Sequence, residues 1–128
     1  MADTEKITIN LSVVDIGKVD LLVEEGFYAN RTDFIRAAIR YQLNRHEEVV
    51  QESAVRKSMV LGVLTFNRAD LMRFQQENKK VACRVVGMLQ MADDIDAELA
   101  RATVESIKVM GVFKASQTVK EALADRIM

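Results

Sequence analysis

The 128-residue sequence contains no proline and no tryptophan, and only 5% of its residues are aromatic. Proline-rich linkers and polyproline ligands are therefore excluded, and so is a platform of aromatic side chains on which nucleic-acid bases could stack. The sequence also lacks a run of about 18 apolar residues that could span a bilayer, and it lacks the pattern of a secretory signal. We therefore expect a protein of the cytoplasm with no membrane partner.

Cysteine and histidine are equally scarce, because Cys83 and His46 are the single examples of each. One cysteine cannot form a disulfide within the chain, and no Cys or His stands near it at metal-ligand spacing. We expect Cys83 to be a small buried apolar side chain. The acidic run from Asp93 to Asp96 fits a helix start better than a calcium loop. We expect no metal site, no cofactor and no catalytic residues.

The net charge gives no indication of nucleic-acid binding, because its formal value is −1. Residues 1–50 carry six Lys and Arg against nine Asp and Glu. Any affinity of this part for DNA must therefore come from the placement of a few cations and not from bulk charge.

Residues 6–11, KITINL, alternate strictly between polar and apolar side chains. This period of two predicts a β-strand with one apolar and one polar face. The apolar set is Ile7, Ile9 and Leu11, and the polar set is Lys6, Thr8 and Asn10. A lone strand of this length has no sheet of its own, so the pattern requires a partner strand.

Two helices are predicted after the strand, over residues 13–25 and from residue 31 onward. Ser12 can cap the first helix, with Asp15 three residues later, and Gly26 can end it in the left-handed conformation. Asn30 can cap the second helix, with Asp33 in its first turn. The apolar pattern allows this second helix to continue toward residue 56.

Three similar segments follow at a nearly fixed spacing: VLGVLTF, VVGMLQM and VMGVFKA. Their glycines, Gly62, Gly87 and Gly111, lie 25 and 24 residues apart. Segments of helical character come after them, over residues 68–80, 93–106 and 116–128. Such a period is typical of stacked supersecondary units. We predict strand-helix units that form a small parallel sheet, and the alternative is a solenoid in which residues 103–113 are extended.

The order strand, helix, glycine-containing turn and helix resembles the ribbon-helix-helix family of CopG-like, Arc-like and MetJ-like regulators. The similarity covers residues 5–46, and its most specific part is Gly26, Phe27 and the run NRTDFIRAA from Asn30 to Ala38. In that family the strands of two subunits pair into a ribbon that enters the major groove of DNA, which is wide enough to admit it. The resemblance implies an N-terminal ribbon-helix-helix that forms an intertwined dimer. With the small α/β domain of three strand-helix repeats that the repeated segments predict, the expected fold is α+β.

The resemblance also implies roles for individual residues. Side chains on the polar face of the strand would contact base edges: Lys6, Thr8 and Asn10. Residues at the start of the second helix would bind a DNA phosphate, because unpaired N–H groups and the helix dipole attract an anion there: Asn30, Arg31 and Thr32. Apolar residues of both elements would form the dimer core: Ile7, Ile9, Leu11, Phe34, Ile35, Ala38 and Ile39.

These expectations divide the chain into three parts. Residues 1–50 form a DNA-binding and dimerisation domain, residues 51–57 a connecting helix or linker, and residues 58–128 an oligomerisation or regulatory domain. We expect a transcriptional regulator, a repressor, that binds double-stranded DNA in the nucleoid as a homodimer, with a tetramer or larger assembly left open. The alternatives are an antitoxin of a toxin-antitoxin pair and a scaffold or polymer protein that is independent of DNA.

Overall fold

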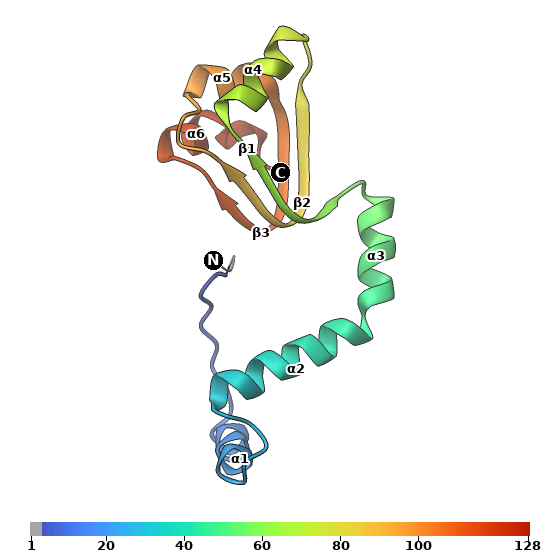
Figure 1. Ribbon diagram of the computed structural model, residues 1–128, viewed down its shortest axis with the longest axis vertical. Helices are drawn as coiled ribbons and strands as arrows, with labels where there is room; N and C mark the ends of the chain where they lie inside the picture. Colours follow the sequence, from blue (N-terminus) through green and yellow to red (C-terminus); the bar gives the residue numbers. More distant parts are fainter. Residues whose placement is uncertain (1–3) are drawn as a thin grey trace. The chain divides into compact units, whose positions relative to one another are not determined.

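The computed structural model describes residues 4–128, and the chain divides into two compact units (Figure 1). The first unit ends at Glu52 and the second runs from Ser53 to Met128. Over the described residues the chain forms six α-helices and a three-stranded parallel sheet. The expected α+β class is therefore confirmed. None of the helices in this part of the chain is long and apolar enough to cross a membrane.

The first unit contains helix α1 (Val13–Glu24) and helix α2 (Arg31–Arg45). The predicted start of α1 is confirmed, because the Asp15 N–H donates to the Ser12 hydroxyl at 3.2 Å. Helix α1 ends before Gly26, which adopts a φ of +87°. The start of α2 is also confirmed, because the Asn30 side-chain oxygen accepts the Asp33 N–H at 2.7 Å.

Two expectations for this unit differ from the structure. Residues 4–11 have no regular secondary structure, so the predicted strand over residues 6–11 is absent from the single chain. The reason is physical, since a strand is defined by hydrogen bonds to a neighbour, and no described residue pairs with this segment. The second helix does not continue to residue 56. It breaks at His46, with φ −107° and ψ 11°, and a separate helix α3 (Glu47–Arg56) follows.

The second unit alternates strands and helices, as the repeats predict. Its elements are β1 (Val60–Phe66), α4 (Arg68–Gln76), β2 (Val81–Met91), α5 (Ala97–Thr103), β3 (Val104–Lys114), α6 (Gln117–Ala122) and a short 3₁₀ helix (Ala124–Arg126). The strands stand in the order β1-β2-β3, and both pairs are parallel. Of the two architectures left open, the chain has the parallel sheet, and β3 nevertheless covers most of the stretch that the solenoid alternative required to be extended.

The repeated glycines lie side by side across the sheet. Gly62 is in register with Gly87, and Gly87 is in register with Gly111. All three have φ between +125° and +136°, which L-residues rarely adopt. A Cβ atom on Gly87 would lie 2.1 Å from the Gly62 carbonyl oxygen, and one on Gly111 would lie 2.0 Å from the Gly87 carbonyl oxygen. The repeat of about 25 residues therefore reflects a close approach of backbones from strand to strand.

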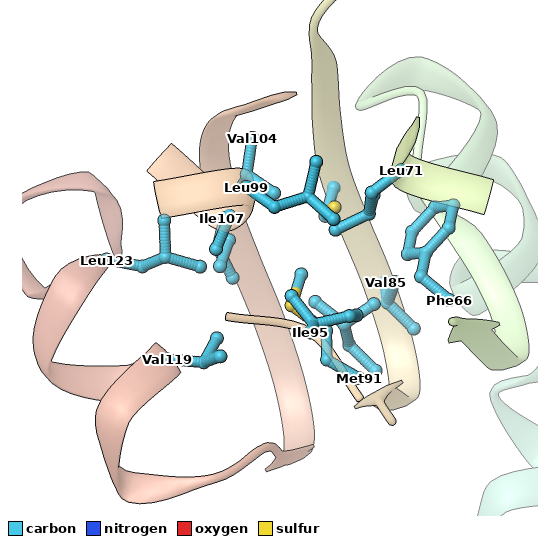
Figure 2. Close-up of a cluster of buried hydrophobic side chains, with 13 residues drawn as sticks. Phe66, Leu71, Val85, Met91, Ile95, Leu99, Val104, Ile107, Val119 and Leu123 are labelled. Atoms are coloured by element: carbon cyan, nitrogen blue, oxygen red, sulfur yellow. The ribbon is translucent and has the colours of Figure 1, made fainter. Parts of the chain in front are cut away.

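The core of this unit lies on one face of the sheet (Figure 2). Alternate residues of β2 and β3, among them Val85 and Ile107, join one buried cluster with Leu71 of α4, Leu99 of α5 and Val119 of α6. The three helices therefore cover the same face. On the opposite face, apolar side chains stay exposed at Leu61, Val63 and Met110.

The three helical segments predicted in this unit are longer than the observed helices, and α4 ends at Gln76 instead of residue 80. Helix α5 stops at Thr103, and residues 104–106, assigned to a helix from the sequence, begin β3. Val119 in α6 and Leu123 at its C-cap are fully buried as their helical spacing predicts, but Ile127 is 46% exposed. The chain leaves the helix before Ile127, which forms an isolated parallel bridge with Ile107.

Candidate nucleic-acid interface

The first unit leaves most of its apolar side chains in contact with solvent. Among its described residues Val19 is the one hydrophobic side chain classed as buried, at 7% exposure. The apolar set of the N-terminal segment is open, with Ile7 at 71%, Ile9 at 55% and Leu11 at 41% exposure. On α2, Phe34 and Ile35 are half-buried, whereas Ala38 and Ile39 are exposed. A unit of this size cannot be stable with so little buried apolar area.

An open groove of about 460 Å³ separates the N-terminal segment from α2. Most of its walls are aliphatic, because Ile7 and Ile9 face Ile35 and Ile39 across it. The polar residues at its margin are Glu5, Lys6, Thr32 and Arg36. Most of the residues predicted to form the dimer core therefore meet at one groove, which is lined on two sides and empty between them.

The predicted base-contacting side chains, Lys6, Thr8 and Asn10, are all exposed. None of them forms a hydrogen bond or ion pair with another of the described residues. Their donors and acceptors are therefore free to contact an external partner. Lys6 is the member of this set that lines the groove, as does Thr32 of α2.

The start of α2 is an ordered helix N-terminus. The Asn30 side chain accepts the Asp33 N–H, and the Asp33 carboxylate accepts the Ala29 N–H at 2.9 Å. This arrangement uses the Asn30 side chain as a cap, as its position predicts. The N–H groups of Arg31 and Thr32 belong to the first turn, where a helix offers no acceptor of its own. These two backbone groups and the positive end of the helix dipole suit an anion.

Arg31 does not point freely into solvent, because its guanidinium is engaged by α1. Its Nε donates to Asp20 Oδ1 at 2.7 Å and its Nη2 donates to Asp20 Oδ2 at 2.8 Å. The hydrogen bond to Arg31 lowers the pKa of Asp20, and the same contact raises the pKa of Arg31. Both side chains are about half exposed, so water screens the attraction.

Sequence reasoning missed Asp20 as a partner of this site. The two residues lie eleven positions apart in different helices, and no spacing rule links them. The two side chains meet because the turn between α1 and α2 sets the angle between the two helices. A second contact in that turn is the edge-to-face packing of Tyr28 on Phe34, with ring centroids 5.0 Å apart.

Other kinds of site find little support in the described residues. No group of three or more His, Cys, Asp or Glu could hold a metal ion there. Cys83 is fully buried in the core of the second unit, and burial raises the pKa of its thiol to about 11. Asp96, in the acidic run from Asp93, caps α5 by accepting the Leu99 N–H at 2.7 Å, as predicted for a helix start.

Comparison with known proteins identifies the family. The model of the Ribbon-Helix-Helix transcriptional regulator family matches residues 2–120, and this range includes most of the second unit as well as the first. The chain therefore belongs to the ribbon-helix-helix transcriptional regulators, which bind DNA. No curated protein and no solved structure is detectably similar to the chain.

Proposed function

We propose that the protein is a sequence-specific repressor that reads the major groove with a two-stranded ribbon formed by two copies of the chain. The observation that carries this proposal is the exposed alternation of the N-terminal segment beside the groove on α2. Ile7 and Ile9 are more than half exposed and border a groove of about 460 Å³ with aliphatic walls. The same segment of a second copy supplies the missing neighbour strand and covers both the strand and the groove.

In this dimer the polar face of the ribbon points toward DNA. Lys6 donates to guanine acceptors, Asn10 pairs with the acceptor and donor of adenine, and Thr8 offers a hydroxyl and a methyl group. All three side chains are exposed and have no partner among the described residues. Base contacts of this kind specify the sequence.

The start of α2 binds a phosphate and sets the position of the ribbon on the duplex. The backbone N–H groups of Arg31 and Thr32 make this contact, assisted by the Thr32 hydroxyl. Asn30 acts by capping the helix, and the side chain of Arg31 contributes only to the extent that it leaves Asp20.

Residues 53–128 form a well-packed unit with thirteen buried core residues, and we propose that it serves oligomerisation or a regulatory input. A unit with its own buried core disfavours the antitoxin alternative, because toxin-masking tails order on binding. Because the chain belongs to a family of transcriptional regulators, we propose no enzymatic activity for it. The protein then acts in the cytoplasm on the chromosome.

The proposal is tested by selecting duplexes from a random-sequence pool with the wild type and with the double variant Thr8→Ala/Asn10→Ala. The wild type should enrich a palindromic or tandem site. The double variant should bind DNA with the same salt dependence and enrich the site much less strongly, because it keeps the phosphate contacts and Lys6 but loses the base contacts of Thr8 and Asn10.

A matched control changes the same residue types away from the ribbon, at the exposed positions Asn44 and Thr118. The variant Asn44→Ala/Thr118→Ala should enrich the wild-type site. Unchanged enrichment by Thr8→Ala/Asn10→Ala would reject base reading by the ribbon. Absence of any salt-dependent DNA binding in the wild type would favour the DNA-independent scaffold.

A further inference from the structure

The two edges of the sheet in the second unit differ in whether other residues pair with them. At the β3 edge, the C-terminal residues return to the sheet: Ile127 bridges to Ile107, and the Met128 N–H donates to the Ile107 carbonyl at 2.7 Å. At the β1 edge, no strand of residues 53–128 pairs with the outer side. An open edge presents unpaired backbone groups and accepts another strand.

The sequence of β1 does nothing to discourage such pairing. VLGVLTF has no charged residue and no proline, although these are the usual means of blunting an edge. Its apolar side chains are open on both faces, with Val60 at 47%, Leu61 at 38% and Val63 at 49% exposure. An uncharged seven-residue strand with this composition is prone to uncontrolled association unless something covers it.

We propose that β1 pairs with β1 of a second copy of the chain, antiparallel and about a two-fold axis at Val63. The two three-stranded sheets then form one continuous sheet with all helices on the same side. A two-fold axis perpendicular to a sheet makes the paired edge strands antiparallel. This inference takes its second copy from the dimer proposed above, which holds the second β1 at a high effective concentration.

The seven residues of β1 are self-complementary in this register. Because Val63 faces itself, the other pairs follow by symmetry: Val60 with Phe66, Leu61 with Thr65 and Gly62 with Leu64. No like charges meet, since the strand has no charges. The absence of a Cβ atom at Gly62, which has nothing within 4 Å of that position, leaves room for the opposing Leu64.

A head-to-tail arrangement, with β1 of one copy on β3 of the next, is disfavoured by the same structure. Ile127 and Met128 already occupy part of the outer edge of β3, at Ile107. Such a contact would also leave an open edge at each end and would build filaments. The antiparallel pair closes after two copies.

Cross-linking of the full chain tests the pairing. In a Val63→Cys variant, a short bismaleimide should link most chains into covalent dimers, whose mass is twice the 14.4 kDa of one chain. Cys83 does not interfere, because it is fully buried with a raised thiol pKa. The matched control is Met110→Cys, on the same open face but on β3, with an exposure of 46% against 49% for Val63. It should give single chains.

Two results would overturn the proposal. One is a Val63→Cys chain that reacts with the reagent and stays single. The other is a covalent link between a Val63→Cys chain and a Met110→Cys chain when the two variants are mixed, which would indicate the head-to-tail contact.

Hydrogen exchange gives an independent measurement. The β1 amides of the wild type should exchange slowly on both edges of the strand, and Val63→Lys should raise their exchange about tenfold or more, because it opposes two ammonium groups at the axis. Met110→Lys should leave the β1 amides unchanged. Equal exchange of β1 in both variants would contradict the pairing.

The outcomes separate this inference from the proposed function. If Val63→Cys does not cross-link while the chain still enriches a DNA site, the pairing is wrong and the repressor proposal stands. If Val63→Cys cross-links while the wild type shows no salt-dependent DNA binding, the repressor proposal is wrong and the pairing stands.

Discussion

Arg31 and Asp20 join the start of α2 to the middle of α1 through two parallel contacts of 2.7 and 2.8 Å. Arg31 is also the residue whose position, at the first turn of a helix beside Thr32, suits a DNA phosphate. One guanidinium cannot offer the same two donors to a carboxylate and to a phosphate. In the proposed DNA complex, Asp20 therefore competes with a phosphate for the Arg31 side chain.

Replacing Asp20 with asparagine should strengthen DNA binding. The variant frees the Arg31 side chain for a phosphate, so the slope of log affinity against log salt should steepen by about 0.9, the value for one added contact. Glu24→Gln is the control, because it removes the same charge from α1 without releasing Arg31. Fluorescence anisotropy over a series of salt concentrations measures both slopes. Equal slopes for the two variants would mean that Arg31 makes no phosphate contact.

Acid should remove the contribution of the ion pair between Asp20 and Arg31 to stability. The pKa of Asp20 is lowered from 3.8 in the folded chain by the hydrogen bond from Arg31. A carboxyl with a lowered folded pKa stabilises the fold above its unfolded value, and this contribution is lost as the pH falls through the folded value. The difference in unfolding free energy between wild type and Asp20→Asn should be constant at neutral pH and vanish in strong acid. Denaturant unfolding at one chain concentration measures it, and a difference that grows toward acid would have the wrong sign.

Gly62, Gly87 and Gly111, which lie in register across the three strands, form a glycine ladder. Substitution by alanine should reduce stability by different amounts at different positions of this ladder. Gly62→Ala forces an L-residue to a φ of +134° but meets nothing within 4 Å in its own chain, so the cost within the chain is strain of about 1–3 kcal/mol. Gly87→Ala adds a Cβ atom 2.1 Å from the Gly62 carbonyl oxygen and should cost more than about 4 kcal/mol. Thermal unfolding of the two variants compares them. Equal losses would mean that the strands can move apart at the ladder without cost.

The sequence predicted those features that depend on neighbours along the chain. The caps at Ser12 and Asn30, the turn at Gly26 and the strand β1 follow from local hydrogen bonding and periodicity. The spacing of Gly62, Gly87 and Gly111 indicated a repeat, although the close approach of their backbones could not be inferred from spacing. The contact of Arg31 with Asp20 was missed because it depends on the angle between two helices. The strand predicted at residues 6–11 is absent because no described residue of the chain pairs with this segment, and its pairing with a second copy is a proposal.

Leu123 and Ile127 are four residues apart, as on one face of a helix, but they differ in burial. Leu123 is fully buried in the core cluster, whereas Ile127 is 46% exposed in a bridge beyond the helix. Leu123→Ala should cost about 2–5 kcal/mol, and Ile127→Ala at most about 1 kcal/mol. Chemical denaturation followed by circular dichroism measures both values. A larger loss for Ile127→Ala would show that the last C-terminal residues, and not Leu123 at the end of α6, close this end of the core.

Cys83 offers a chemical measure of the opening of the second unit. The thiolate is the reactive form, and Cys83 has no exposed surface and a pKa raised to about 11 by burial, so its native state should not react with a maleimide near neutral pH. Labelling then requires unfolding around β2, and its rate should rise with destabilisation of the core. Leu123→Ala should therefore label much faster than wild type at equal pH, and Ile127→Ala only slightly faster. Mass spectrometry over time measures the labelled fraction. Rapid labelling of the native wild type, at the rate of an exposed thiol, would contradict the packing of β2 against α4 and α5.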